Sequence, residues 1–456
     1  MEQENFRENV SFELEEVNTL LREKNYSKLR EYLIGTNPVD TALIINELED
    51  VKDALLVFRM LPKEDASTVF AYLEGENRLS IIENVSEKEL KSIMQELYFD
   101  DKIDMIEEMP AGYVDKILRN ITPDERSLVN EFLMYPEDSA GSLMTIEYVS
   151  INENYTVERA LTYLHEVGLK KETIYTCYVT DRNLKLIGLV SLRSLVLSAP
   201  DVKIKDIMEQ DVISLDTDDD QEYVADQFSK YDFISMPVVD KTHKLVGIVT
   251  FDDIVHVVEE ETTEDFHKMA AITPTDTPYL ETSSGSIAKS RLPWLLFLML
   301  SATLTSTVIK LNFAIIAQFA ILPVLMPMLT DTGGNAASQS STLVIRGLAT
   351  GEIEDKDWKK ILVKEFFVSL ITSAVLILVI SVRVVIIERE SFIVSLTVSL
   401  ALIFTVFASN FIGCMLPIGA KKLGLDPATM AVPLITTIVD ASSLIIYFSI
   451  AKSILL

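Results

Sequence analysis

Five long runs of hydrophobic residues occupy the last third of the chain, at about 292–309, 312–345, 361–385, 391–418 and 430–451. A helix needs roughly 20 mainly apolar residues to cross the hydrocarbon core of a bilayer. All five runs approach or exceed that length. The pattern therefore predicts an all-α transmembrane domain with five spans.

The charged residues between these runs predict how the spans are oriented. Lys and Arg gather between residues 346 and 364, after the second run, and again at Lys421 and Lys422, after the fourth. Basic loops stay on the cytosolic side of a membrane. We therefore expect a multi-pass protein of the cytoplasmic membrane with a cytosolic N-terminus and an external C-terminus. The loop between the third and fourth runs is a mild exception, since it contains both arginine and glutamate.

Residues 1–135 show a different pattern, in which apolar positions recur at i, i+3 and i+4 within short segments. This spacing is typical of amphipathic helices. Acidic residues and prolines separate the segments, and Ser86 with Glu89 has the spacing of a capping box. The segments recur every 23–25 residues or so, roughly the length of a helical repeat, which predicts a small superhelix of α-helices.

Residues 138–262 contain an internal repeat. Met144 in the first copy corresponds to Met208 in the second, and Gly188 corresponds to Gly247. Each copy reads as a strand, a helix, two strands around a polar turn and a further helix. This α+β arrangement resembles a tandem pair of CBS domains. Such pairs bind adenine nucleotides, metal ions or nothing, so the fold leaves the ligand open.

The second copy continues directly into an acidic segment, DDIVHVVEEETTEDFHKMA, which reads as one helix of about twenty residues. Glu261, Glu264 and Asp265 share one face of that helix. Like charges at this spacing destabilise a helix unless water screens them or a cation bridges them. A connector rich in Pro, Thr and Ser separates the helix from the membrane part.

These patterns predict five parts: a helical N-terminal domain (1–135), a first and a second CBS domain (136–200 and 201–258), an acidic connecting helix with its linker (259–290) and the membrane domain (291–456).

The charges are unevenly distributed along the chain. Residues 1–290 contain 28 basic and 59 acidic residues, a net charge of −31, whereas the remainder contains 12 basic and 10 acidic residues. This charge argues against nucleic acid as a partner, because phosphate binding needs a basic surface. It attracts divalent cations, although acidic surfaces also serve solubility.

The sequence contains little that suits enzymatic chemistry. Cys177 and Cys414 lie in different regions, and the four histidines are scattered, so neither a disulfide framework nor a zinc site is readable. No phosphate-binding loop or nucleophile–histidine arrangement is visible. We therefore do not expect an enzyme.

The second hydrophobic run is unusually polar for a membrane span. A break or kink near its middle is predicted by Pro323, Pro327, Gly333 and Gly334. Polar side chains lie at the same depth, namely Asp331, Asn335, Ser338, Gln339 and Ser340. Irregular, polar backbone is tolerated in a membrane only where it is buried in protein or lines a watery cavity. We interpret this segment as part of a pore, with close packing of small residues as the alternative.

Asp440 lies inside the last hydrophobic run, with no basic residue near it in the sequence. A carboxylate near the bilayer midplane costs roughly 2.5–3.5 kcal/mol on insertion scales. Thr436 and Thr437 lie within one turn of it, and Pro433 predicts a kink just before them. Oxygen ligands without His or Cys suit a hard cation. Asp440 is thus interpreted as an acid in a cation pathway; the alternative is an acid satisfied by neighbouring hydroxyls or lying near the interface.

One carboxylate per chain is too few to hold a dehydrated ion. Mg²⁺ keeps several of its waters and is usually met by one or two carboxylates. A pore on a two-fold axis would bring two Asp440 side chains together, and a divalent cation between them would offset their repulsion. A homodimer with its pore on the two-fold axis is therefore our hypothesis.

In the order of its parts, the chain resembles the MgtE family of magnesium channels and transporters. Three segments carry the resemblance: GGNAASQSSTLVIRGLATGEI (333–353), DPATMAVPLITTIVD (426–440) and FDDIVHVVEEETTEDFHK (251–268). The resemblance implies Mg²⁺ import by a homodimer in membrane lipid, with a pore lined mainly by the second and fifth spans, where Asp440 meets hydrated Mg²⁺. The pore-lining candidates are Gly333, Gly334, Asn335, Pro433, Thr436 and Thr437.

The resemblance also implies a cytosolic Mg²⁺ sensor. At high internal Mg²⁺, ions bridge acids of the N-terminal domain, the CBS pair and the connecting helix, which then acts as a plug over the pore; at low Mg²⁺ the acids repel one another. The sensor candidates are Asp100, Asp104, Glu222, Asp232, Asp253, Glu261, Glu264 and Asp265. Two positions depart from the family pattern: His256 stands where a further acid is expected, and Val432 precedes Pro433 in place of a small or polar residue.

Some members of the family also bind ATP at the CBS pair, and the residues leave this open here. Two other functions stay in view: a transporter that prefers Co²⁺, Mn²⁺ or Ca²⁺, and a membrane-anchored CBS nucleotide sensor that moves no ions. The polar second run argues against the sensor, because a mere anchor needs no such segment.

Overall fold

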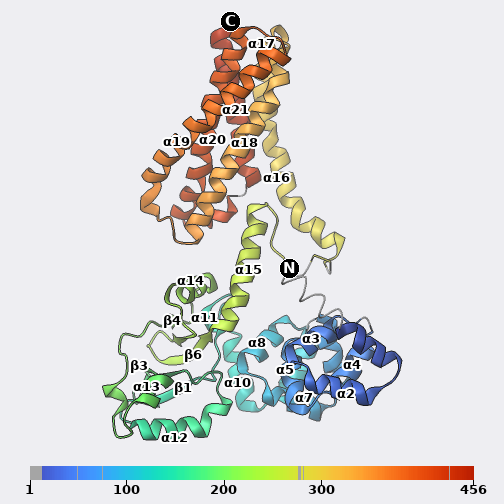
Figure 1. The fold of residues 1–456 in the computed structure, drawn as a ribbon, viewed down its shortest axis with the longest axis vertical. Helices are drawn as coiled ribbons and strands as arrows, with labels where there is room; N and C mark the ends of the chain where they lie inside the picture. The colour runs from blue at the N-terminus through green and yellow to red at the C-terminus, as the bar shows by residue number, and fades with distance from the viewer. Residues whose placement is uncertain (1–12, 49, 74, 276–278, 281, 431) are drawn as a thin grey trace. The chain divides into compact units, whose positions relative to one another are not determined.

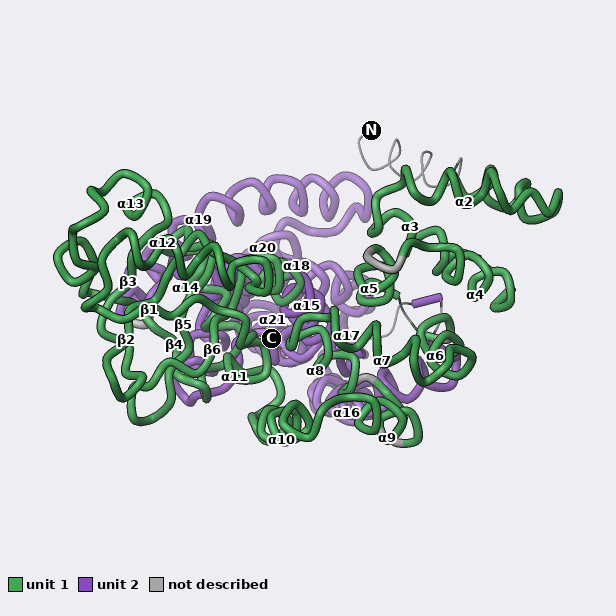
Figure 2. Tube along the Cα trace, turned by 90° about the horizontal axis from the view of Figure 1, so that it is seen from below, with its two compact units in different colours: residues 1–258 green, residues 259–456 purple. Residues whose placement is uncertain are grey.

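The computed structural model describes residues 13–456 except 49, 74, 276–278, 281 and 431. The chain divides into two compact units, residues 1–258 and 259–456 (Figures 1 and 2). The division falls inside helix α15 (Phe251–Met269). Unit 1 contains the short N-terminal helices and the internal repeat, and unit 2 contains the long apolar helices.

The N-terminal part of unit 1 is a stack of short helices (Figure 1): α2 (Tyr26–Gly35), α3 (Pro38–Asn46), α4 (Val51–Met60), α5 (Lys63–Ala71), α6 (Gly75–Asn84), α7 (Glu87–Glu96), α8 (Phe99–Glu108), α9 (Ala111–Asn120) and α10 (Pro123–Phe132). Alternate helices pack on one another, α3 on α5, α4 on α6, α5 on α7 and α7 on α9. Helices α4, α6, α8 and α10 begin 24 residues apart. The predicted helical stack and its recurrence are therefore confirmed.

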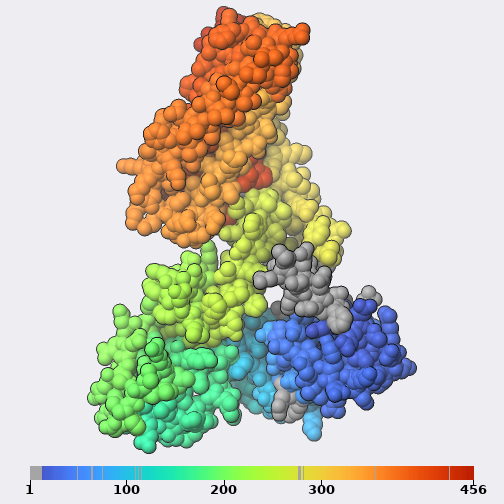
Figure 3. Space-filling model, viewed as in Figure 1, coloured from blue at the N-terminus to red at the C-terminus, as the bar shows by residue number. Residues whose placement is uncertain are grey.

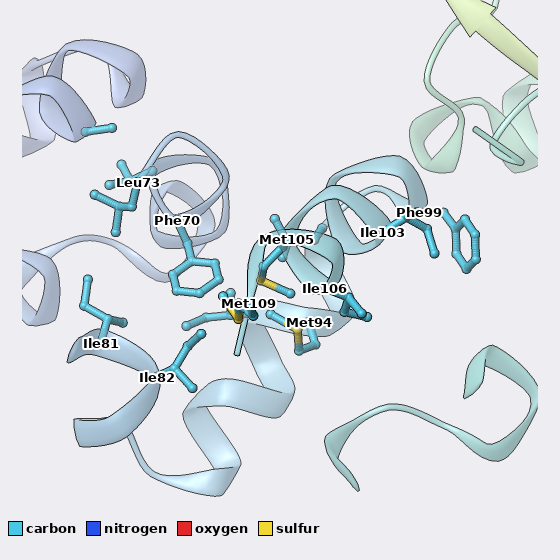
Figure 4. Packing of buried hydrophobic residues seen from close by; sticks show 14 of the residues in the cluster. Phe70, Leu73, Ile81, Ile82, Met94, Phe99, Ile103, Met105, Ile106 and Met109 are labelled. Carbon is cyan, nitrogen blue, oxygen red and sulfur yellow. The ribbon is translucent and has the colours of Figure 1, made fainter. Parts of the chain in front are cut away.

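Local capping and a shared apolar core explain why these segments are helical. The Ser86 hydroxyl accepts a hydrogen bond from the Glu89 N–H at 3.3 Å, and the Glu89 carboxylate accepts one from the Ser86 N–H at 2.8 Å. The predicted capping box is thus confirmed, and it satisfies two N–H groups that a helix start leaves without partners. The apolar faces of the helices meet in a core, part of which Figure 4 shows. Because this core also includes Val238 and Val249 of the repeat, the helical stack and the repeat form one unit.

Each copy of the internal repeat contains a three-stranded sheet. In the first copy, β1 (Val149–Asn152) pairs in parallel with β2 (Thr176–Thr180), which pairs antiparallel with β3 (Leu186–Ser191). The second copy has the same order in β4 (Leu215–Asp216), β5 (Ser235–Val239) and β6 (Leu245–Thr250). The helices are α11 (Ala140–Leu143), α12 (Val157–Val167) and α13 (Leu192–Leu197), then α14 (Gln221–Tyr231) and α15. The predicted order of strands and helices is confirmed in both copies.

The residues that define the repeat also join its two copies. A Cβ atom on Gly188 would lie 2.9 Å from the Met208 sulfur, and one on Gly247 would lie 2.5 Å from the Met144 sulfur. Only glycine lets the strand approach the other copy this closely. The repeat therefore has an approximate two-fold arrangement, in which each copy contributes one glycine and one methionine.

Unit 2 begins with the end of α15 and continues with α16 (Ser284–Leu311), α17 (Phe313–Gln318), α18 (Ile321–Ala349), α19 (Trp358–Val382), α20 (Phe392–Lys422) and α21 (Val432–Leu455). A π-helical turn, Arg383–Ile387, extends α19. Among the described residues, four helices suit a membrane span by length and composition: α16, α19 with its π turn, α20 and α21. Helix α18 has 29 residues but is more polar, and it packs against both α20 and α21. Figure 3 shows the surface of the same chain, with the long apolar helices in yellow to red. The count of five spans stays a prediction.

The predicted break in the middle of the second run is wrong. The chain turns earlier, between α17 and α18, and α18 then continues without interruption through both glycines. A Cβ atom on Gly333 would lie 2.9 Å from the Ser443 hydroxyl oxygen, and one on Gly334 would lie 2.9 Å from the Thr436 methyl. The glycines thus serve close packing of α18 against its neighbours, and those contacts outweigh the low helix propensity of glycine.

The predicted kink at Pro433 also needs correction. Helix α21 begins at Val432, so Pro433 lies in its first turn, where the missing N–H interrupts no helical hydrogen bond. A short 3₁₀ turn, Pro427–Thr429, precedes the helix. The Asp426 carboxylate caps this turn by accepting a hydrogen bond from the Ala428 N–H at 2.8 Å.

Candidate cation sites

Asp440 is half-buried in the first half of α21. Three hydroxyls nearby donate to backbone carbonyls of their own helix: Thr436 and Thr437 at 2.9 Å each, and Ser442 at 2.8 Å. A hydroxyl has one proton, so none of these three also donates to Asp440. The alternative of an acid satisfied by its neighbouring hydroxyls is therefore excluded for these three. Their oxygen lone pairs remain for a cation or a water molecule.

Helix α18 presents a polar face to the exterior of the single chain. Asp331, Asn335 and Gln339 are exposed and follow one another at intervals of four residues, which places them on one side of the helix. Gly333 and Gly334 are buried against α20 and α21 instead. Of the three pore-lining candidates on this helix, Asn335 is therefore the one that an ion could reach, whereas Gly333 and Gly334 are buried.

The candidates on α21 lie along its N-terminal part. Pro433, Thr436 and Thr437 are partly buried, and the Thr436 hydroxyl lies 3.5 Å from the Ser338 hydroxyl of α18. Val432, the noted departure, is the first residue of the helix. The lining of a pore by the six candidates stays a prediction.

A second group of acids gathers in unit 1, where the helical stack meets the CBS pair. Asp100 lies in the first turn of α8, and Asp253 lies in the first turn of α15. The charges of Asp253, Asp101 and Glu172 all act on Asp100. The structure thus brings two predicted sensor residues together and adds two that the sequence did not single out.

Burial and like charge raise the pKa values in this acidic cluster. Burial, followed by the charges of its neighbours, raises the pKa of Asp100 to about 9. The same causes raise the pKa of Glu172 to about 7. Burial raises the pKa of Asp253 to about 6, although a hydrogen bond from the Thr250 hydroxyl at 2.8 Å and the charge of His256 oppose the rise. Carboxylates that hold protons near neutral pH are ready to exchange them for a cation.

The cluster has the donor atoms of a hard cation site. Carboxylate and hydroxyl oxygens are the ligands that Mg²⁺ prefers. One oxygen of Glu172, Oε2, is buried and lacks a hydrogen-bond partner among the described residues, and such an atom often marks the place of a water or an ion. Over the described parts of the chain, no three acidic, His or Cys side chains stand close enough to hold a metal ion directly. The arrangement therefore fits a hydrated ion that bridges separate acids.

The other sensor candidates of unit 1 lie on α8 and at the two ends of α14. Asp104 is exposed on α8, and Glu222 lies in the first turn of α14. Asp232 ends α14 in a left-handed conformation, with φ 53°. A left-handed Asp at a helix end has a local structural explanation, because its short polar side chain tolerates that backbone.

In unit 2, the end of α15 is joined to the loop before α21 by an ion pair. The Lys268 ammonium lies 2.7 Å from a Glu264 carboxylate oxygen and 2.9 Å from an Asp426 carboxylate oxygen. Burial and the charge of Asp426 raise the pKa of Asp265. The predicted sensor residues Glu264 and Asp265 thus belong to a charged group that includes its own cation. Glu261 is half-buried one turn earlier.

Four residues of these groups were not predicted as site residues from the sequence. Asp101 directly follows Asp100, so the sequence shows two adjacent acids there but does not say which of them belongs to the site. Asp331 was noted only as polar, and its spacing of four from Asn335 marks the shared face. Glu172 lies between α12 and β2, and Lys268 is a lone base in an acidic helix; for these two the sequence carries no signal, because their partners are distant in the chain.

Family models match the N-terminal helices, both copies of the repeat and most of the last third of the chain. One described as "Divalent cation transporter" matches residues 326–450, one described as "MgtE intracellular N domain" matches residues 36–138, and the CBS domain model matches residues 140–200 and 204–260.

Full-length relatives and solved structures agree with these matches. The chain is 36% identical to the magnesium transporter MgtE of Thermus thermophilus over 95% of its own length and 97% of the relative. It is 34% identical to the magnesium transporter MgtE of Bacillus subtilis, with 95% of each chain covered. Among solved structures, the cytosolic domain of the Mg²⁺ channel MgtE in complex with ATP matches 53% of the chain and 98% of that domain, with 36% identity and a TM-score of 0.50. The soluble part of a magnesium transporter matches 55% of the chain at 30% identity, also with a TM-score of 0.50.

Proposed function

Because the chain belongs to the MgtE family of divalent cation transporters, we propose that it imports Mg²⁺ through the cytoplasmic membrane and that internal Mg²⁺ closes its pore. The relatives that match over 95% of the chain are named as magnesium transporters and not as enzymes, in line with the expectation from the sequence. One observation carries the proposal: Asp440 lies within an apolar helix of membrane length, and three nearby hydroxyls direct their protons away from it.

In the proposed pore, the carboxylate of Asp440 meets an ion that keeps its water. Mg²⁺ dehydrates reluctantly, so a carboxylate that accepts hydrogen bonds from its bound waters holds it without a full cage. Such an acid favours divalent over monovalent cations, because the attraction scales with the charge of the ion. Asn335, Thr436 and Thr437 would line the same path with further oxygen atoms.

We propose a homodimer in the lipid bilayer, with the five segments α16, α17–α18, α19, α20 and α21 as spans. The exposed polar face of α18 supports this arrangement, because polar side chains facing lipid are unfavourable and a second copy would enclose them. The N-terminus would lie in the cytosol and the C-terminus outside, as the basic loops predict.

The acids of the cytosolic part form the proposed sensor. Without Mg²⁺, the ionised carboxylates of Asp100, Asp253 and Glu172 repel one another, and this repulsion works against close packing of α8 on α15. A bound divalent cation would offset the repulsion and favour the packed state. A ligand shifts a conformational equilibrium only by binding one state more tightly, and ions that bridge two elements satisfy this condition. Connecting helix α15 would then act as the plug.

Two further points follow from the relatives. The structure of a relative's cytosolic domain contains ATP, and we propose the same ligand for the CBS pair of this chain, where isothermal titration with ATP would reveal it.

The family description covers divalent cations in general, so Co²⁺, Mn²⁺ and Ca²⁺ are the competitors to compare with Mg²⁺.

Flux through the full chain in proteoliposomes tests the function. We expect Mg²⁺ flux that falls as Mg²⁺ rises on the cytosolic face, a preference for Mg²⁺ over the three competitors, and loss of flux in Asp440→Asn. The control is Glu390→Gln, in the segment between α19 and α20, and it should behave like the original chain. Absence of flux at every cytosolic Mg²⁺ concentration would refute the transport proposal, and unchanged flux in Asp440→Asn would remove Asp440 from the pore.

A further inference from the structure

Helix α18 contains a second carboxylate at the depth of Asp440. Asp331 lies on the exposed polar face that continues through Asn335 and Gln339. It lies within the stretch in which α18 packs against α21, since Tyr447 of α21 bonds to Leu322 before it and the close contacts of Gly333 and Gly334 follow it within one turn. Asp331 is thus held on a rigid helix, next to a helix seam whose geometry is defined by close contacts.

The register of the two helices places Asp331 level with Asp440. The helices are antiparallel, because the Tyr447 hydroxyl bonds to the Leu322 carbonyl at 3.2 Å, whereas the Ser338 and Thr436 hydroxyls meet at the opposite end of the seam. Asp440 therefore falls opposite the glycine pair.

The contacts of Gly333 and Gly334 define more closely which residues of α18 and α21 lie at the same height. Gly333 touches Ser443 and Gly334 touches Thr436, which lie three residues after and four residues before Asp440. Asp331 lies two residues before Gly333, a rise of about 3 Å along a helix. The two acids are also close enough for the charge of Asp331 to act on Asp440.

Two like charges at this depth need a cation. Among the ion pairs of the described residues, none involves Asp331 or Asp440. Facing carboxylates disfavour each other's ionisation unless an opposite charge lies between them, and a charge within a membrane is costly when it lacks a partner. No basic side chain in these ion pairs offsets the charges of Asp331 and Asp440, whereas a transported cation would offset them.

We propose that Asp331 is a second ion-facing carboxylate, which with Asp440 of the same chain binds the hydrated divalent cation and determines its selectivity. This proposal rests on the proposed function. Hydrated Mg²⁺ presents a shell of water protons, so it gains from several acceptors around it. Two acids per chain, and four in a homodimer, attract a divalent ion far more strongly than a monovalent one.

Flux measurements on the full chain test this proposal. Removing one charge near a divalent ion is expected to raise the Mg²⁺ concentration for half-maximal flux by about tenfold in Asp331→Asn. Block by cobalt hexammine, a stable analogue of a fully hydrated cation, should weaken in parallel, and leakage of Na⁺ should rise. Asp331→Glu should restore both properties, and Glu390→Gln should change neither.

A chemical readout that does not depend on flux supplements these variants. In Asp331→Cys, a charged methanethiosulfonate applied from water should modify the new thiol, and Mg²⁺ should slow the modification; native Cys177 and Cys414 are buried. Modification with the sulfonate reagent should restore block by cobalt hexammine, whereas the ammonium reagent should not.

The outcomes separate the two proposals. If the original chain conducts and Asp440→Asn does not, but Asp331→Asn keeps the original Mg²⁺ dependence and block, then Asp331 does not face the ion and this inference is overturned. A thiol at position 331 that reacts at the same rate with and without Mg²⁺ would overturn it as well. If the original chain fails to conduct, the proposed function fails first.

Discussion

At the scale of single residues, the close packing of α18 against α20 and α21 depends on the absence of a side chain at Gly333. A Cβ atom there would lie 2.8 Å from the Thr405 methyl, 2.9 Å from the Ser443 hydroxyl oxygen and 3.0 Å from the Ser409 hydroxyl oxygen. These neighbours belong to α20 and α21, so no single rotamer change relieves all three contacts. The same glycine that lowers helix propensity thus holds together the helices that carry Asp331 and Asp440.

Gly333→Ala should therefore destabilise the membrane part and reduce flux. Overpacking of a dense core costs typically about 1–3 kcal/mol, and a displaced α18 would move Asp331 relative to Asp440. Thermal unfolding in detergent, followed by Trp fluorescence, measures the first effect and proteoliposome flux measures the second.

Gly419→Ala is the matched control for this variant. Gly419 also lies in a membrane helix, α20, but nothing lies within 4 Å of a Cβ atom there. This variant should be neutral or slightly stabilising. Equal losses in the two variants would show that the close approach at Gly333 is not the cause.

At the scale of elements, the end of α15 is tied to the loop that precedes α21. Lys268 bridges Glu264 of its own helix and Asp426 of that loop. Asp426 also caps the 3₁₀ turn before α21. A movement of α15 would therefore reach the helix of Asp440 through one carboxylate.

Lys268→Met should weaken closure under the proposed gating. The variant keeps the apolar stem but leaves Glu264, Asp265 and Asp426 without their cation, so the acids repel one another. Partly exposed ion pairs contribute about 0.2–1 kcal/mol each, which predicts that a few-fold more cytosolic Mg²⁺ is needed to close the pore. Flux against cytosolic Mg²⁺ is the measurement.

Two comparisons interpret this result. The double variant Lys268→Met, Asp426→Asn should show much less than the sum of the single effects, because the pair interacts directly. Lys356→Met removes an exposed pair with Glu354 outside the long helices and should leave closure unchanged. Unaltered Mg²⁺ dependence in Lys268→Met would show that the ion pair is not part of the gate.

At the scale of the whole molecule, the acidic cluster makes the cytosolic part sensitive to pH. Its folded-state pKa values of about 9 for Asp100, about 7 for Glu172 and about 6 for Asp253 lie above the ordinary values of 4.5 for Glu and 3.8 for Asp. At pH values between the ordinary and the folded-state pKa of each group, the folded state binds more protons than the unfolded state. Stability therefore falls as pH rises from about 4 towards 9 and levels off above that range.

Thermal unfolding of residues 1–270 across this pH range tests the sign. The relatives' cytosolic parts have been solved separately, so this fragment is a reasonable sample. We expect the midpoint to fall with pH by a few degrees without divalent ions and to fall much less with Mg²⁺, which replaces the protons. Asp100→Asn should reduce the slope, whereas Asp124→Asn, which removes an exposed acid, should not. A slope that Asp100→Asn leaves unchanged would contradict the assignment.

The sequence by itself determined the elements whose signals are local or periodic. The helical stack of residues 26–132 follows from apolar spacing and caps, because a helix satisfies its backbone within one segment. The two sheets follow from an internal repeat, and the apolar helices follow from runs of membrane length. The choice of Asp440 also needed no structure, since an acid in an apolar run stands out by its neighbours in the chain.

Only the tertiary structure decided what depends on contacts between distant segments. The sequence predicted that Gly333 and Gly334 break a helix, but packing against α20 and α21 holds α18 intact. Glu172 joined Asp100 and Asp253, Lys268 met Asp426, and Asp331 came level with Asp440, although none of these pairs is near in sequence. Electrostatic energy depends on distance in space, so the pattern of residues along the chain identifies the charges but not their partners.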